Sequence, residues 1–177
     1  MRILIIAAVI FWLIVGFAFG QTAPKSEYEI RVKTNHLVVK YQKKSHDLKL
    51  LDEIGARRIE DAKILFAKRS GDFTYLVVDV SGMSKEKPDD RMCGAGVEAN
   101  LLWLKLDDRW EIKAVDSILY ESCWVTVMAD EGYKISGNTL SIHFENFRDD
   151  LITDLTYDND RPEKGFAKKT AALNVDK

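Results

Sequence analysis

Phe73–Val80 reads Phe-Thr-Tyr-Leu-Val-Val-Asp-Val and follows the turn-forming residues Ser70-Gly71-Asp72. The β-branched and aromatic residues of this stretch favour a strand, and Lys63–Arg69 before the turn favours another. In Val77–Val80 the apolar side chains point to both faces of such a strand. This is expected for a central strand of a sheet, because both of its faces are covered.

A hairpin is expected before this pair of strands. Glu27–Lys33 alternates charged and apolar residues, which is the period-two pattern of a half-buried strand. Asn35 marks a turn, and Leu37–Gln42 returns with apolar residues on one face. The two segments are therefore predicted to pair as antiparallel neighbours.

After the pair, strands are expected at Leu101–Leu106 and Trp110–Tyr120. Asp107-Asp108 between them is the expected turn. In that register Trp103 and Trp110 lie on the same face of the sheet. Two indoles on one face would form the centre of the core, because aromatic side chains bury large apolar areas.

The rest of the chain contains mainly short strand-like segments. Strands are expected at Trp124–Met128, Tyr133–Ile135, Leu140–Phe144, Leu151–Tyr157 and Phe166–Ala172, and the longest loop at Ser81–Asn100. Leu48–Ala62 approaches helical spacing but is interrupted by Gly55, so it is expected to form at most one short helix. The sequence predicts an all-β, antiparallel fold of about nine or ten strands. A sandwich, a barrel and a meander all remain open.

The N-terminus has the pattern of an export signal. Arg2 precedes an uncharged apolar run, and small residues stand before a cleavage point after Gly20. Residues 1–20 are therefore interpreted as a signal peptide, 21–26 as a flexible lead, 27–173 as a single β-rich domain and 174–177 as a frayed tail. An uncleaved anchor is the alternative, because the run approaches the length that spans a bilayer. The expected location is secreted or periplasmic.

The charge balance bears on the classes of partner. The chain has 26 Lys+Arg and 28 Asp+Glu, a formal net charge of −2 at pH 7. Nucleic-acid binders carry a basic face, so nucleic acid is not an expected partner. No membrane partner is expected after signal cleavage. Another exported protein or an envelope component is the expected partner, and the oligomeric state is left open.

Cys93 and Cys123 are the two cysteines of the chain. In an oxidising compartment a pair of cysteines is first interpreted as a disulfide. Closing this loop would stabilise the fold by roughly 3 to 4 kcal/mol in the chain-entropy model. Two buried free thiols are the alternative.

The predicted disulfide defines a candidate binding surface. It would hold the long loop against Glu121–Trp124, and binding residues tend to lie on loops held by a rigid sheet. The candidate residues are Asp89, Asp90, Arg91, Glu121 and Trp124. The alternative is a disulfide that only stabilises the fold.

Several catalytic motifs can be discounted. Ser141, His143 and Glu145 would share one face of a strand, but same-face neighbours stand about 6 to 7 Å apart, too far to activate a serine. A solvated outer face is the favoured interpretation. Residues 93–96 contain two glycines but lack the Lys-Ser/Thr ending of a phosphate-binding loop. No catalytic residue is therefore predicted.

Neither a metal nor a cofactor is predicted. The three histidines, His36, His46 and His143, lack the spacing of paired zinc ligands. Asp158-Asn159-Asp160 with Glu163 offers oxygen ligands for calcium, but departs from the EF-hand pattern. A turn is the favoured interpretation of this segment.

The sequence favours an exported, non-enzymatic binding or interaction module, such as an inhibitor, an immunity protein or an envelope accessory protein. The alternative is a small hydrolase that uses carboxylates brought together by the fold, drawn from Asp89, Asp90, Glu121 and Asp149-Asp150. A membrane-tethered structural domain is the third hypothesis, and it requires an uncleaved N-terminus. The ligand itself cannot be derived from the sequence.

Overall fold

The computed structural model describes residues 27–33, 35–85, 96–122, 124–129 and 131–173. The elements in chain order are β1 (Tyr28–Lys33), β2 (His36–Tyr41), β3 (Lys44–Leu48), α1 (Leu51–Ile54), β4 (Ala56–Ser70), β5 (Phe73–Ser84), β6 (Val97–Leu106), β7 (Ile112–Ser122), β8 (Val127–Met128), β9 (Tyr133–Ser136), β10 (Thr139–Asn146), β11 (Leu151–Asp158), η1 (Pro162–Lys164) and β12 (Ala167–Ala172). No helix in these ranges is long and apolar enough to cross a membrane.

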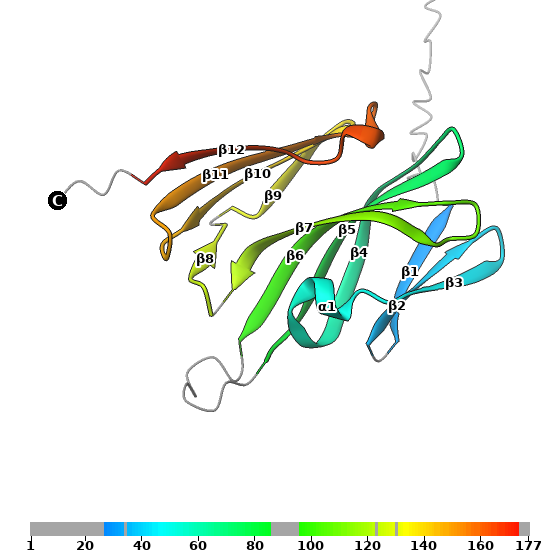
Figure 1. Cartoon of the computed structure of the whole chain (residues 1–177), viewed down its shortest axis with the longest axis horizontal. Helices are drawn as coiled ribbons and strands as arrows, with labels where there is room; N and C mark the ends of the chain where they lie inside the picture. The colour runs from blue at the N-terminus through cyan, green and yellow to red at the C-terminus, as the bar shows by residue number, and fades with distance from the viewer. Residues whose placement is uncertain (1–26, 34, 86–95, 123, 130, 174–177) are drawn as a thin grey trace, which may run out of the picture.

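The strands form two antiparallel sheets. β1-β2-β3 is a small sheet, and the large one has the order β12-β11-β10-β8-β7-β6-β5-β4, with β9 paired to β10. The large sheet folds over at the short strand β8, so that β9–β12 lie over one face of β4–β7, while β1–β3 and α1 lie on the other side (Figure 1). The all-β antiparallel prediction is confirmed, and the sheets do not close into a barrel.

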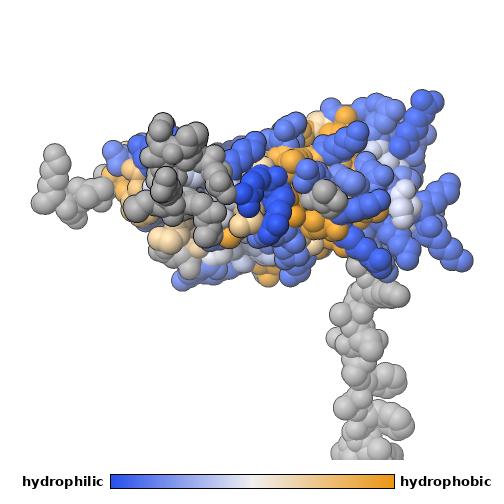
Figure 2. Space-filling view, turned by 90° about the horizontal axis from the view of Figure 1, so that it is seen from below, coloured by the Kyte–Doolittle hydropathy of each residue, from blue (hydrophilic) through white to orange (hydrophobic). Residues whose placement is uncertain are grey.

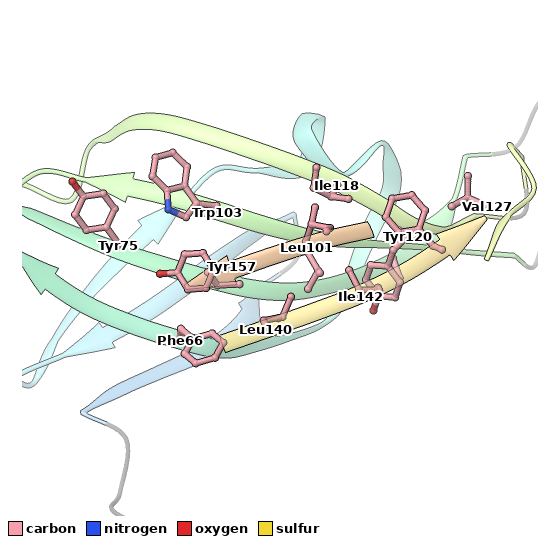
Figure 3. Packing of buried hydrophobic residues seen from close by; sticks show 14 residues of the cluster. Phe66, Tyr75, Leu101, Trp103, Ile118, Tyr120, Val127, Leu140, Ile142 and Tyr157 are labelled. Carbon is pink, nitrogen blue, oxygen red and sulfur yellow. The ribbon is translucent and has the colours of Figure 1, made fainter. Parts of the chain in front are cut away.

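Both faces of the central β4–β7 sheet are buried, as predicted for the strand around Val77–Val80. Towards β1–β3 the buried residues form what we call the aliphatic core: Leu37, Val39, Leu48, Leu50, Ile54, Ala56, Ile59, Leu76, Val78, Val80, Leu102, Leu104 and Leu106. Towards β9–β12 they form the aromatic core: Phe66, Tyr75, Val77, Ala99, Leu101, Trp103, Ile118, Tyr120, Val127, Leu140, Ile142, Phe144, Leu155 and Tyr157 (Figure 3). The alternation of side chains along β5 and β6 produces this division.

The expected helix is reduced to one turn. α1 ends at Gly55, which has a left-handed backbone with φ of 70°. Ile59 and Ala62, expected on that helix, belong to β4 instead. β4 contains register shifts at 56–58 and 59–61, where extra residues bulge out of the ladder. The bulges lengthen the spacing of inward-facing residues, so the strand resembles a helix in sequence.

The expectation that Trp103 and Trp110 share a face is wrong. The turn after β6 includes residues 107–111 rather than two aspartates, and the ladder has a further shift before Leu106. Trp103 therefore pairs with Asp116 and faces the aromatic core. Trp110, with φ of 65°, packs against the aliphatic core and stacks on His46 at 4.2 Å.

Two further boundaries differ from expectation. Ser81–Asn100 is not a loop throughout, because β5 continues to Ser84 and β6 begins at Val97. The strand expected at Trp124–Met128 contains two residues only. Strand β3 was not anticipated by the sequence pattern.

Candidate binding site

A cavity of about 340 Å³ opens at the end of the aromatic core where the large sheet folds over. Its lining, which we call the apolar hollow, consists of Val97, Glu121, Ser122, Thr126, Val127, Met128 and Phe147. Val97, Met128 and Phe147 are 40%, 51% and 43% exposed. They are three of the four large hydrophobic side chains exposed in the described ranges, the fourth being Ile135. The exposed apolar groups are therefore concentrated at one place.

The turn between β7 and β8 shapes one wall of the hollow. The hydroxyl oxygen of Ser122 accepts hydrogen bonds from the backbone N–H groups of Trp124 and Val125, at 3.1 and 3.3 Å. Thr126 has a positive φ of 50°, which is uncommon for a β-branched residue, and its carbonyl accepts from Phe147 N–H at 3.2 Å. These bonds hold the wall in place before any ligand arrives.

β8 completes the hollow by joining the two layers. Val127 pairs with Ser122 on β7 and with Asn146 on β10. Met128 pairs with Glu145, and its side chain remains half exposed. Val97 and Met128 are thus carried by strands, and Phe147 follows β10 directly in the turn to β11, where its N–H donates to the carbonyl of Thr126.

A second cavity, of about 190 Å³, adjoins the hollow. We call it the acidic pocket, and it is lined by Asp61, Asp79, Ser81, Val97, Ala99, Tyr120 and Glu121. Val97 and Glu121 line both cavities. In the sheet register Asp61 pairs with Ser81, Ser81 with Ala99, and Ala99 with Glu121. The pocket therefore crosses β4–β7 in one row.

Asp79 is held by two tyrosines from different layers. Tyr120 on β7 donates to one carboxylate oxygen at 2.8 Å, and Tyr133 on β9 donates to the other at 3.0 Å. Burial, followed by the nearby charge of Asp79, raises the pKa of Tyr133 to about 12 and that of Tyr120 further. Both hydroxyls consequently remain protonated donors at neutral pH, and Asp79 links β5 to the overlying layer.

Of the predicted surface residues, Glu121 lies at the border of the two cavities. Trp124 lies on the Ser122 turn beside the hollow and is half-buried. Asp89, Asp90 and Arg91, and both cysteines, Cys93 and Cys123, lie outside the described residues, so the disulfide remains a prediction.

Sequence reasoning missed Asp61, Asp79 and the three exposed apolar residues. Asp79 did carry a signal, since it is the one charged residue in the apolar stretch Phe73–Val80. A carboxylate in a central strand needs polar partners. Val97, Met128 and Phe147 carried none, because they are brought together only by the folding over of the sheet.

A third cavity, of about 490 Å³, runs along β10 and contains Ser141, His143, Glu145 and Asp154 in its lining. His143 Nδ1 lies 2.8 Å from an oxygen of Asp154, its cross-strand partner. These two side chains are 60% and 64% exposed, which fits the predicted solvated face. Ser141 is two residues away on the same strand, a rise of about 6 to 7 Å. The set does not form a nucleophile and base in contact.

The segment Asp158-Asn159-Asp160, considered above as a weak calcium candidate, is used for local structure. Asp158 accepts hydrogen bonds from Asp160 N–H and from the guanidinium of Arg161, each at 2.9 Å. These donors hold the pKa of the Asp158 carboxyl below its usual range. Within the described ranges no group of three His, Cys, Asp or Glu side chains is arranged to hold a metal ion.

Comparisons with protein-family models, curated proteins and solved structures gave no match to this chain. Function must therefore be argued from the site.

Proposed function

We propose that this chain is an exported, non-enzymatic binding module that holds another exported protein or an envelope component at the apolar hollow. The observation that carries the proposal is the concentration of exposed Val97, Met128 and Phe147 in one cavity. Single exposed apolar side chains are common on protein surfaces, whereas a group rimmed by polar residues is typical of an interaction site. Export rests on the signal-like sequence of residues 1–20.

Figure 2 shows one face of the molecule from below. Its right-hand end, where the β4–β5 and β6–β7 turns lie, is almost entirely hydrophilic, and hydrophobic surface lies mainly in the middle of this face. A partner that buries apolar area would thus gain least at the hydrophilic end.

The predicted disulfide supports the same surface. Cys123 directly follows Ser122, which lines the hollow. A bond to Cys93 would therefore tether residues 89–91 near the rim and reduce the ordering cost of binding. Thiol labelling of the exported protein before and after reduction tests this, since labelling without reduction would exclude the bond.

A carboxylate-dependent hydrolase is the second candidate, favoured by Asp61, Asp79 and Glu121 around one cavity. Two carboxylates can act as acid and base when their environments differ. Asp79 already accepts a tyrosine hydroxyl on each oxygen and holds two layers of the fold together, which is a structural role. Asp149, from the earlier hypothesis, bonds Asn146 in the β10–β11 turn instead of reaching this pocket. Binding is therefore favoured over hydrolysis.

Three tagged full-length chains expressed in the native host would test the proposal: wild type, Phe147→Glu and Ile135→Glu. Ile135 is 47% exposed and does not line the hollow, so its variant is a matched control. A partner quantified by mass spectrometry should be retained by wild type and Ile135→Glu and lost from Phe147→Glu, with equal melting temperatures.

Equal recovery of that partner with all three proteins would show that the hollow is not the binding surface. Hydrolysis of an ester or glycoside panel that Glu121→Gln abolishes would favour the second candidate over the first.

A further inference from the structure

The apolar hollow and the acidic pocket form one surface with two compartments. They share Val97 and Glu121 in their linings, so they are neighbours along β6 and β7. Any segment that fills the hollow therefore places its next residues beside the carboxylates. The chemistry of the pocket then restricts the chemistry of the partner.

The pocket selects positive charge. Three carboxylates line the pocket, those of Asp61, Asp79 and Glu121. The described lining of both cavities contains no Lys, Arg or His. Asp79 accepts one tyrosine on each oxygen, and a carboxylate has about four lone-pair sites, so it can accept further donors. A cation that supplies its own N–H donors fits these acceptors better than a bare metal ion.

The spacing of the compartments fits an extended peptide. Val97 lines both cavities, and Ala99, two residues further along β6 and a step of about 7 Å away, lines the pocket alone. Side chains two apart on a bound extended segment lie on the same face with the same step. One side chain can then occupy each compartment.

We infer that the hollow and the pocket together bind an extended segment of a partner protein, with a large apolar side chain two residues from a lysine or arginine. This inference rests on the proposed function and specifies its partner. The apolar side chain packs among Val97, Met128 and Phe147, and the cation meets the three carboxylates.

Other occupants fit less well. A second copy bound through the same patch would place Glu121 and the acidic pocket against their own symmetry mates, and like charges in an interface oppose association. An anionic membrane surface would be repelled by the same carboxylates. A basic and apolar peptide satisfies both compartments at once.

Two blocked peptides that differ in one residue test the inference: acetyl-Thr-Leu-Thr-Lys-Thr-amide and the version with glutamate in place of lysine. The chain has four methionines, so the methyl spectrum of methionine-labelled protein is simple and Met128 reports on the hollow. The lysine peptide should shift the Met128 methyl resonance and bind about fivefold more tightly than the glutamate peptide, as expected for a partly exposed charge pair.

Charge reversal provides the decisive variants. Glu121→Lys should abolish or invert the preference between the peptides. Glu163→Lys makes the same charge change on η1, at the Trp103 end of the aromatic core, and should leave the preference intact. Melting curves confirm that both variants fold.

Three outcomes would overturn the inference: equal binding of both peptides, binding of neither while Phe147→Glu still loses the native partner, or concentration-dependent dimerisation that Phe147→Glu removes. The second outcome leaves the proposed function standing and rejects only the peptide chemistry. Loss of the proposed function itself would appear separately, as retention of the partner by Phe147→Glu.

Discussion

The two faces of the central β4–β7 sheet are covered in different ways. Towards β1–β3 the buried apolar side chains are all aliphatic, and Leu76, Leu102, Leu104 and Leu106 have no exposed surface. Towards β9–β12 aromatic rings alternate with aliphatic residues, and the apolar hollow and the acidic pocket lie along this side. Branched aliphatic side chains interdigitate closely, whereas large rings with polar ends need hydrogen-bond partners and leave gaps between layers.

The difference in packing between the two faces separates the more closely packed core from the side that carries the proposed binding surface. The aliphatic face is closed by a separate sheet and by α1, and polar side chains buried on it are paired: Asn100 donates to the carbonyl of Ile54 at 3.1 Å, and Ser84 donates to Glu98 at 2.7 Å. The aromatic face depends on polar bridges, from Trp103 to the carbonyl of Pro162 at 2.8 Å and from two tyrosines to Asp79. The less completely packed face is the one that carries the proposed binding surface.

Leu104→Ala should have the largest effect, a loss of about 3 to 5 kcal/mol in the free energy of unfolding, because the closed aliphatic core cannot collapse around the void. Leu155→Ala, equally buried but in the aromatic core, should cost only about 2 kcal/mol, since the less closely packed rings can move into the void. Denaturant titration of both variants measures the difference. Equal losses would contradict the contrast between the faces.

Gly82→Ala tests how closely β4 and β5 approach each other near the end of β5, at the edge of the aliphatic core. A Cβ at Gly82 would overlap the carbonyl oxygen of Arg58 and lie 2.7 Å from the Cβ of Ala56, so β4 and β5 must move apart. The expected loss is about 1 to 3 kcal/mol, measured by thermal unfolding. Ser81→Ala, on the opposite face, should change stability by less than about 0.5 kcal/mol. A neutral Gly82→Ala would show that β4 is free to shift.

Trp103→Phe should cost about 1 to 2 kcal/mol, because it leaves the carbonyl of Pro162 without its indole donor. Trp110→Phe on the other face keeps a ring to stack on His46 and should cost less. Chemical denaturation of the two variants gives the comparison. The opposite order would mean that the indole bridge does not hold the overlying layer.

Tyr133→Phe should have the smallest effect at neutral pH, about 0.5 to 1.5 kcal/mol for one lost hydrogen bond. The clearest effect of the substitution is on the dependence of stability on pH above about pH 10. Burial raises the pKa of Tyr133 from its usual 10.0 to about 12, so folding favours the protonated phenol. The stabilisation that the protonated Tyr133 contributes to the folded state is fully present below pH 10 and is lost as the pH rises to about 12.

The variant should therefore lose stability less steeply than wild type between pH 10 and 12, as unfolding curves at stepped pH would show. Some slope will remain, because burial also raises the pKa of Tyr28 to about 12. If wild type and Tyr133→Phe lost stability equally between pH 10 and 12, the hydrogen bond between Tyr133 and Asp79 would be contradicted.

Strand alternation made much of the fold predictable. The hairpin of β1 and β2, the pair β4 and β5, and the Gly137-Asn138 turn between β9 and β10 all follow from period-two patterns and turn residues. The errors fall where the period is broken. The bulges in β4 give its apolar residues a spacing similar to that of a helix. Trp110 has a positive φ, which residue preferences do not indicate, so the β6–β7 turn is longer than expected.

The site was less predictable than the fold. Glu121 was identified because it stands near a cysteine in the sequence. Its neighbours Asp61, Asp79 and Val97 come from three other strands, and only sheet register brings them to one pocket. Phe147 and Met128 meet there because the sheet folds over at β8. Such long-range relations are not encoded in local periodicity.

The placement of the indoles has an optical consequence. Trp103 donates to a backbone carbonyl in one core, whereas Trp110 stacks on His46 in the other, so their emission spectra report on different surroundings. Burial, followed by the charge of Lys44, lowers the pKa of His46, so the imidazole beside Trp110 gains its proton only under more acidic conditions than usual. Fluorescence from chains that retain a single one of these tryptophans would thus follow the melting of each half of the molecule separately.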